Sequence, residues 1–356
     1  MIRTARSTIT HFTQRSQPRE QPHHCLLARA YDSARILVPI DFSPHLGVIL
    51  TACLLDALFG DPVYRLHPVR LIGALSLVGE QALFGVGLNG RFGGVLHWFL
   101  VVGGALAVWW AVRLGLALWH PWLALAWDCF IAYSLLCMRD LLVHGRRVLA
   151  ALDDLPSARQ RLSLLVGRDT EPLGRGGIVR ATIESLAENL TDGVLTPLWA
   201  LCLFGLPGLI IVKAVSTLDS MVGYRNARYG RFGWAGARSD DLVHWLPARL
   251  SVPLIALAAV PLGLHPWLAV RTAWRDHARL PSPNSGWSEA ACAGALRVRL
   301  VGPTRYGGAL RDYAYLGDPA WPIDLDAGHL RRALGLILLC SVLALGVGLG
   351  LAALRG

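Results

Sequence analysis

Residues 194–213 read VLTPLWALCLFGLPGLIIVK, an apolar stretch with the break Gly205-Leu206-Pro207-Gly208 at its centre. Each half holds about ten apolar residues, roughly half of what a helix needs to cross a bilayer. Proline and glycine kink or end helices, and broken helices occur at membrane depth where protein surrounds them. The stretch therefore predicts a broken, re-entrant membrane helix that keeps residues 213–249 on the same side of the membrane as residues 139–193.

The composition indicates an integral membrane protein. Hydrophobic residues make up 54% of the chain and charged residues only 16%, whereas soluble domains carry about 25% charged residues. Apolar blocks occupy residues 46–59, 93–118, 121–138, 250–270 and 333–354. The second and third blocks predict a transmembrane hairpin that turns at His120, and Pro261 and Gly263 interrupt the fourth block. We expect an all-α fold, a polytopic transmembrane helical protein with broken or re-entrant helices and helical cytoplasmic loops.

The charge pattern suggests orientation and partners. The net charge of +10 fits anionic membrane lipid and the excess of arginine in cytoplasmic loops, and we expect no nucleic-acid partner. The polar segments 139–193, 213–249 and 271–328 are expected to face the cytoplasm. Residues 1–35 are rich in arginine and lack an apolar block, which predicts a disordered basic N-terminal extension. Residues 36–356 are expected to form a single integral-membrane catalytic domain.

A first group of candidate site residues lies in ATIESLAENLTDGVLTP, residues 181–197. Glu184, Glu188 and Asp192 follow one another at intervals of four residues, so a helix presents them on one face, within an arc of roughly 80°. Carboxylates gathered in this way repel one another unless a cation neutralises them, and Mg²⁺ held by carboxylates and substrate phosphates is a common solution. The alternative is a solvated acidic face with Arg180 as its partner.

A second group follows Lys213, which is the only lysine in the chain. The next residues, to position 241, mix basic and acidic side chains, and a phosphate with its metal ion would bind such a mixture. The members of this group are Lys213, Asp219, Arg225, Asn226, Arg228, Arg238, Asp240 and Asp241. Two alternatives stay open at this point: a basic loop that touches lipid headgroups, and a set of internal ion pairs.

Two further motifs are less specific. Residues 280–296, LPSPNSGWSEAACAGAL, predict a turn and a helix that Asn284 begins, with Glu289 in its first turn. An ordinary capped turn explains this spacing. Asp56 interrupts the apolar helix expected over residues 46–59 and needs a partner, for which Arg70 and Lys213 are the candidates.

Four motifs together resemble one enzyme family. ESLAENLTDGVLTPLW, KAVSTLDSMVGYRNARYGRFGWAGARSDDLVHWLPARL, PSPNSGWSEAACAGAL and GDPVYRLHPVRLIG are similar to motifs of the adenosylcobinamide-phosphate synthase family of cobalamin biosynthesis. The resemblance implies a multi-pass protein of the bacterial inner membrane with its active site facing the cytoplasm. It implies ATP-dependent amide formation between adenosylcobyric acid and aminopropanol or its O-phosphate, with ATP and Mg²⁺ required. Other enzymes of the corrinoid pathway are candidate partners.

This chemistry assigns expected roles to the candidate residues. Glu188, Lys213 and Glu184 are expected to be catalytic, and Glu184, Asp192, Asp219, Asp240 and Asp241 to hold the metal ion. Substrate and phosphate contacts are expected from Arg225, Asn226, Arg228, Arg238, Asn284 and Asn189, with corrinoid contacts from Tyr224, Tyr229, Phe232 and Trp234. The alternatives are a membrane transporter for a corrinoid or an anion, and a membrane regulatory protein of the same superfamily.

Overall fold

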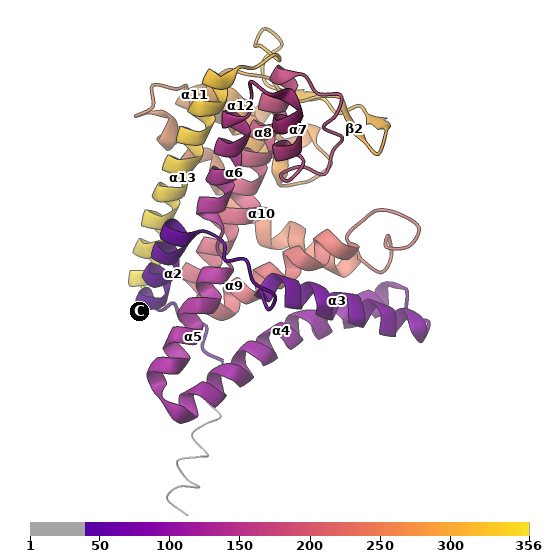
Figure 1. Cartoon of the computed structure of the whole chain (residues 1–356), viewed down its shortest axis with the longest axis vertical. Coiled ribbons are helices and arrows are strands. Elements are labelled where there is room, and N and C mark those ends of the chain that lie inside the picture. The colour runs from indigo at the N-terminus through magenta and orange to yellow at the C-terminus, as the bar shows by residue number, and fades with distance from the viewer. Residues whose placement is uncertain (1–39, 356) are drawn as a thin grey trace, which may run out of the picture. The chain divides into compact units, whose positions relative to one another are not determined.

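The computed structural model describes residues 40–355, so the extension predicted over residues 1–35 lies outside the described residues. The described part is built mainly of helices (Figure 1). The helices are α2 (Leu46–Phe59), α3 (Pro68–Gly85), α4 (Arg91–Trp119), α5 (Pro121–Ser134), α6 (Met138–Ala150), α7 (Leu155–Leu162), α8 (Arg175–Asn189), η1 (Leu190–Leu195), α9 (Thr196–Val222), α10 (Trp234–Ala259), α11 (Pro266–Asp276), η2 (His277–Arg279), α12 (Ser285–Leu296) and α13 (Ala327–Ala353). The predicted helical fold class is confirmed.

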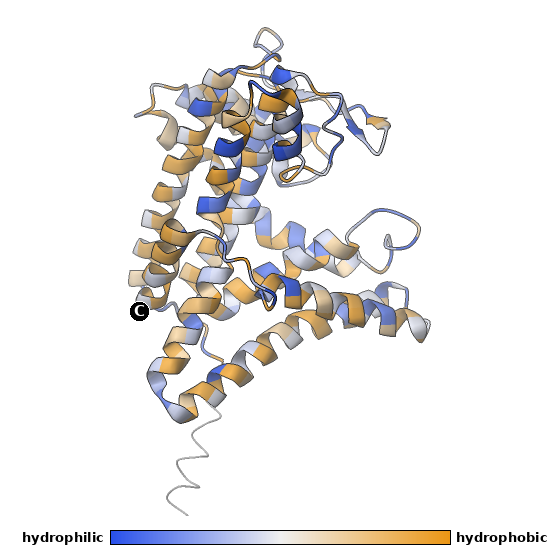
Figure 2. Cartoon of the chain, in the orientation of Figure 1, coloured by the Kyte–Doolittle hydropathy of each residue, from blue (hydrophilic) through white to orange (hydrophobic). Residues whose placement is uncertain are grey.

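Among the described residues, five helical segments are long and apolar enough to cross a membrane. They are Arg91–Trp119, Pro121–Ala150, Arg175–Val222, Trp234–Ala259 and Ala327–Ala353. Figure 2 shows hydrophobic residues along α2, α4 and α13, whereas polar residues gather on α6, α7 and the loops near them. The chain is therefore a multi-pass membrane protein, as its composition predicts.

The predicted hairpin at His120 is present, with a difference at its second arm. Asp128 of α5 accepts hydrogen bonds from Trp109 Nε1 at 3.0 Å and from Arg113 Nε at 2.8 Å, both on α4. The 14 residues of α5 span only about 21 Å at 1.5 Å per residue, less than the ~30 Å of a bilayer core. The chain continues after a short turn into α6, so α5 and α6 together form the candidate span.

The helix α9 folds back on itself at the predicted break. Phe204 and Gly205 have non-helical backbone angles, and Gly205 has φ 62° and ψ −165°, a conformation open mainly to glycine. Thr196 Oγ1 lies 2.8 Å from Nδ1 of His244, and Ser216 Oγ lies 3.2 Å from Nε2 of the same ring. A straight helix would separate Thr196 from Ser216 by about 30 Å. The two halves of α9 therefore form a hairpin, and the predicted broken helix is confirmed.

Contacts at both ends of α13 show how far the hairpin of α9 extends along that helix. At the start of α8, Gly176 packs against Asp324, just before α13 begins. Beyond the end of α13, Arg355 donates a hydrogen bond to the carbonyl of Leu203, next to the break. The path from α8 through η1 to the first half of α9 therefore accompanies α13 along its length, and the second half of α9 returns toward the polar end.

The interruption expected near Pro261 and Gly263 is also present. Helix α10 ends at Ala259 and α11 begins at Pro266, and Gly263 has φ 63° in the turn between them. His265 N donates a hydrogen bond to Ala295 O of α12, so the turn is held against that helix. Every residue of α12 is buried, and its small residues let α10 and α11 pack closely around it.

Two short antiparallel ribbons follow α12, and the sequence analysis did not predict them. β1 (Leu300–Val301) pairs with β4 (Tyr315–Leu316), and β2 (Thr304–Tyr306) pairs with β3 (Ala309–Arg311). The turn between β2 and β3 is fixed because Asp169 accepts hydrogen bonds from Gly307 N and Gly308 N. These ribbons bring the segment after α12 against the loop that precedes α8.

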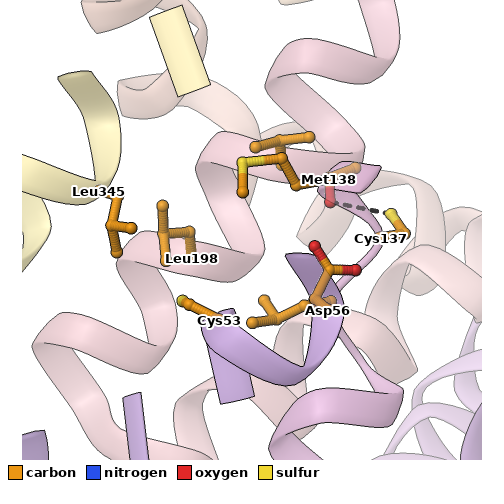
Figure 3. A pocket seen from close by; sticks show the side chains of 9 residues that line it. Cys53, Asp56, Cys137, Met138, Leu198 and Leu345 are labelled. Atoms are coloured by element: carbon orange, nitrogen blue, oxygen red, sulfur yellow. Dashed lines mark hydrogen bonds between the residues drawn. The ribbon is translucent and has the colours of Figure 1, made fainter. Parts of the chain in front are cut away.

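Asp56 has a different partner from the two that were predicted. The side chain is 1% exposed, and Oδ2 accepts a hydrogen bond from the backbone N of Arg139 at 3.2 Å. The expectation of Arg70 or Lys213 is therefore wrong: the first turn of α6 supplies a backbone donor, which costs no second buried charge. Figure 3 shows Asp56 beside Cys137 and Met138 at the start of α6.

Candidate functional site

A buried histidine joins three of the segments that carry candidate residues. His244 of α10 is 2% exposed, with Nδ1 3.4 Å from Asp192 Oδ1 and Nε2 3.2 Å from Asp240 Oδ1. Thr196 and Ser216 contact the same ring from the two halves of α9. The sequence analysis missed His244, although its position four residues after Asp240 puts both side chains on one helical face.

Local backbone geometry explains how Asp192 reaches this ring. Asp192 lies in η1, a π-helical segment of six residues between α8 and α9. Such segments are rare and frequently occur at functional sites, because the wider turn re-aims side chains. On α9, the return of the chain after Gly205 brings Lys213 and Asp219 back to the level of η1.

The predicted metal ligands other than Glu184 lie together at this place. Asp219 is an electrostatic neighbour of Asp240, Asp241 and His244, and Asp192 is a neighbour of Asp219 and Asp240. Lys213 is near enough for its charge to act on His244. We refer to Asp192, Lys213, Asp219, Asp240 and Asp241 as the aspartate–lysine face. Residues from distant parts of the sequence thus converge on one side of the α9 hairpin.

The residues of this face are of the types that could hold a magnesium ion together with ligands from outside the protein. Its donors are carboxylate oxygens, which Mg²⁺ prefers, and Oδ1 of Asp240 is buried with His244 Nε2 3.2 Å away. Within residues 40–355, no group of three or more His, Cys, Asp or Glu side chains is arranged to hold a metal ion by itself. An open carboxylate set is what Mg²⁺ uses when substrate phosphates and water complete its coordination.

Glu184 lies apart from the aspartate–lysine face and is held by the fold. Its carboxylate is 2% exposed, Oε2 lies 2.6 Å from Arg168 Nη1, and Oε1 lies 3.6 Å from Arg180 Nε. Oε1 also accepts a hydrogen bond from Val301 N of β1 at 2.6 Å. Arg180 is the partner that the alternative interpretation named. These contacts give Glu184 a structural role, and its catalytic and metal-binding roles stay predictions.

Two other carboxylates in this region have no partner. Glu188 of α8 is solvent-exposed, and Glu289 of α12 is 6% exposed. Within the described residues, neither makes a hydrogen bond or an ion pair, although Arg168 is close enough to influence both. Burial and the nearby Glu188 carboxylate raise the pKa of Glu289 well above its ordinary value. The sequence analysis placed Glu289 in the first turn of a helix but assigned it no role.

The basic residues after α9 divide into free and engaged groups. Arg225 and Arg238 are exposed near the aspartate–lysine face, and Arg238 Nη1 lies 3.6 Å from Asp241 Oδ2. Arg228, by contrast, binds Glu80 Oε1 of α3 through Nε at 3.1 Å and Nη2 at 2.6 Å. The Arg228 guanidinium therefore anchors its own loop, whereas Arg225 and Arg238 are exposed and can meet a ligand.

Three asparagines with predicted substrate contacts make bonds within the protein. Asn226 Oδ1 accepts from Tyr229 N, and Asn189 Nδ2 donates to Ser185 O. Asn284 Nδ2 donates to the backbone O of Asp241 at 2.8 Å, which ties the start of α12 to α10. Asn284 thus holds the site together, and the substrate-binding roles of all three stay predictions.

The aromatic residues expected to contact the corrinoid differ in exposure. Tyr224 and Trp234 are 57% and 41% exposed, so both are accessible. Phe232 is 1% exposed and packs against Phe84 and His97. The expectation for Phe232 is wrong, because this ring fills the core between α3, α4 and the loop after α9.

A small cavity lies behind η1, and it is no substrate site. Cys53, Asp56, Cys137, Gly193 and Leu198 are among its lining residues, and its volume is about 20 Å³ (Figure 3). Cys137 Sγ donates a hydrogen bond to Gly193 O across it. A space of this size suits about one water molecule, so the open carboxylate region remains the candidate site.

Comparison with known proteins supplies independent information. A family model described as CobD/Cbib protein matches residues 49–337. The cobalamin biosynthesis protein CobD of Geobacter metallireducens is 46% identical over 306 residues, which cover 83% of this chain and 96% of that relative. CbiB of Salmonella typhimurium, also called a cobalamin biosynthesis protein, is 39% identical over 308 residues, 83% of this chain and 94% of that relative. No solved structure matches the chain.

Proposed function

This chain belongs to the CobD/Cbib protein family, and from this premise we propose that it is an ATP-dependent amide ligase of cobalamin biosynthesis. The substrates are adenosylcobyric acid and aminopropanol or its O-phosphate. The products are adenosylcobinamide or its phosphate, ADP and inorganic phosphate. A role in cobalamin biosynthesis follows from the family, and the ligase reaction is the finer proposal.

The reaction requires a carboxylate to become an acylating group. Transfer of a phosphoryl group from ATP to the propionate carboxylate gives an acyl phosphate, which an amine can attack. In such transfers the protein acts mainly by positioning and by stabilising the charge of the moving phosphoryl group. The site must therefore hold several anionic groups close together, away from competing water.

The aspartate–lysine face has the residues for this task. Asp192, Asp219 and Asp240, with Asp241 beside them, would hold Mg²⁺, which neutralises phosphate charge when it is bound. Lys213 contacts the transferred phosphoryl group from α9. Arg225 and Arg238, both exposed nearby, bind the nucleotide or the phosphate of the amine, since guanidinium groups pair with phosphate in a bidentate way.

One observation carries the proposal above the others. His244 contacts Asp192 and Asp240 and also both halves of the α9 hairpin, one of which bears Lys213 and Asp219. These contacts support the proposal, because a phosphoryl-transfer site requires metal-binding and phosphate-binding residues close together. We place this face on the cytoplasmic side of the bacterial inner membrane, where ATP is available and where arginine-rich loops are retained. Other corrinoid-pathway enzymes are the expected partners there.

The test is reconstitution with purified protein in detergent. Adenosylcobyric acid, each amine, ATP and Mg²⁺ are incubated with the protein, and mass spectrometry follows the amide product. We expect product with wild type, none with Lys213→Met, and normal product with Arg331→Met, which changes an exposed arginine at the start of α13. Equal turnover by the Lys213 and Arg331 variants would reject the role of Lys213.

The transporter alternative has one observation in its favour. Broken helices with charged residues near the binding site are typical of secondary transporters, and α9 is broken at Phe204 and Gly205. Uptake of corrinoid or phosphate into proteoliposomes without ATP, combined with no amide product, would favour that function over the ligase.

A further inference from the structure

Glu188 of α8 and Glu289 of α12 are neighbouring carboxylates on different helices, and within the described residues neither makes an ion pair. Helices α8 and α12 pack together, and Glu188 is the charged neighbour that acts most strongly on Glu289. The nearby guanidinium groups do not neutralise the two carboxylates. Arg168 and Arg180 are both engaged by Glu184, at 2.6 Å and 3.6 Å. The pair therefore lacks one compensating positive charge.

The burial of Glu289 makes this lack of a partner costly. An ionised carboxylate that is removed from water destabilises the fold unless a cation or hydrogen-bond donors accompany it. Glu289 is 6% exposed on a helix that is otherwise made of small and apolar residues. A protein retains such a group more readily when a ligand supplies the missing partner, and buried unpaired polar groups call for such an explanation.

The place of the pair points to the amine rather than to the metal ion. Asp192 is an electrostatic neighbour of both Glu188 and Glu289, and it also belongs to the aspartate–lysine face. A ligand at the glutamate pair would therefore lie next to the transferred phosphoryl group. The amine substrate arrives as an ammonium ion, whose N–H donors suit two separate carboxylates.

We propose that Glu188 and Glu289 form the subsite for the ammonium group of the amine substrate and that Glu289 accepts its proton. This inference rests on the proposed amide ligation. The ammonium nitrogen gives one proton to Glu289, and the neutral amine then attacks the carbonyl carbon of the acyl phosphate. The C–N bond forms, the C–O bond to phosphate breaks, and the second proton of the nitrogen leaves with the phosphate as HPO₄²⁻.

The environment of Glu289 favours this direction of proton transfer. A buried pair of charges is expensive in a medium of low dielectric, whereas a neutral carboxyl group beside a neutral amine avoids that cost. Glu188 is exposed, so it meets the ammonium at the entrance. The proton then returns from Glu289 to solvent past Glu188. The two glutamates thus divide the work of attracting the substrate and deprotonating it.

The experiment compares two acceptors of the activated carboxylate. Aminopropanol needs deprotonation, whereas hydroxylamine is uncharged at neutral pH and traps an acyl phosphate as a hydroxamate without a base. For Glu289→Gln and Glu188→Gln we expect a loss of roughly 100-fold or more in kcat/KM for aminopropanol, the size of a general-base contribution. Hydroxamate formation should stay at the wild-type rate. Glu171→Gln, which changes an exposed glutamate of the loop before α8, should alter neither reaction.

Other outcomes overturn the proposal. Two results would show that the pair serves activation of the carboxylate instead. One is an equal loss of activity with both acceptors, and the other is a raised KM for Mg²⁺ with an unchanged KM for the amine. Glu289→Asp keeps the charge and should retain more activity than Glu289→Gln if both fold. If wild type forms neither product, the ligase proposal fails. Calorimetric titration with aminopropanol then tests the cation subsite separately. Binding to wild type but not to Glu289→Gln supports the subsite, and any other result rejects it.

Discussion

His244 Nδ1 lies 3.4 Å from Asp192 Oδ1, so the first half of α10 and the π-helical segment η1 meet through a histidine and an aspartate. The contact explains why the acidic residues before the α9 hairpin and those after it form one site. His244 is buried, so the ring has a fixed place between them. A change at either residue should disturb the site without removing a membrane span.

Asp192→Asn tests this relationship. The amide has nearly the same shape as the carboxylate but lacks the charge that the metal ion and His244 need. We expect kcat for amide formation to fall by roughly 100-fold or more and the Mg²⁺ concentration for half-maximal rate to rise, both measured by product mass spectrometry. Asp312→Asn, at an exposed position between β3 and β4, is the matched control. Activity within a few-fold of wild type would remove Asp192 from the metal site.

Glu184→Gln should act on stability. Loss of the charge leaves Arg168 buried beside a neutral group, and breaking a buried pair costs about 3–5 kcal/mol. We expect a clearly lower melting temperature in detergent, measured by intrinsic tryptophan fluorescence, with Glu171→Gln unchanged. An unaltered melting temperature together with a higher Mg²⁺ requirement would instead support the predicted role of Glu184 as a metal ligand.

Gly205→Ala should damage the α9 hairpin. Gly205 has φ 62°, and a Cβ there would lie 2.6 Å from Ser43 O. Backbone strain at such positions is about 1–3 kcal/mol, and Lys213 and Asp219 would move with the second half of the helix. We expect a lower yield of folded protein and less product. Gly346→Ala in α13 meets no atom within 4 Å and should behave like wild type. Equal yields of both variants would contradict the hairpin geometry.

The stability of Glu289→Gln relative to wild type should depend on pH. Because the folded-state pKa of Glu289 is raised by burial and by the charge of Glu188 and Glu184, its contribution favours folding below the unfolded value of roughly 4.3. That contribution is lost as pH rises through the higher folded value. Arg168 opposes this effect in part. Glutamine does not ionise, so the variant's melting temperature should gain on wild type as the pH rises from the unfolded value through the higher folded value. A constant or shrinking difference would contradict the raised pKa.

The features that short segments determine could be predicted from the sequence. Glycine and proline at 205–208 set the break in α9, and the apolar blocks match α2, α4 and α13 closely. In each case the physical cause acts within a few residues of the chain.

The features that depend on tertiary contacts could not be predicted from the sequence. Glu184, Glu188 and Asp192 follow one another at the same interval, so the spacing does not distinguish them. Arg168 and Val301 N, which are far away in the sequence, contact only Glu184 of the three. Glu289 looked like an ordinary first-turn residue because nothing in its segment announces that α12 is buried on all sides. The partner of Asp56 is a backbone N–H, which no side-chain pattern reveals.

The central claim is that the aspartate–lysine face activates the carboxylate by phosphoryl transfer, and isotope transfer tests it most directly. Adenosylcobyric acid labelled with ¹⁸O in its free carboxylate is converted in the presence of aminopropanol, ATP and Mg²⁺, and mass spectrometry locates the label. The account predicts one ¹⁸O atom in inorganic phosphate for each amide formed, with ADP as the second product. Amide formation with unlabelled phosphate, or with the label in AMP, would contradict it.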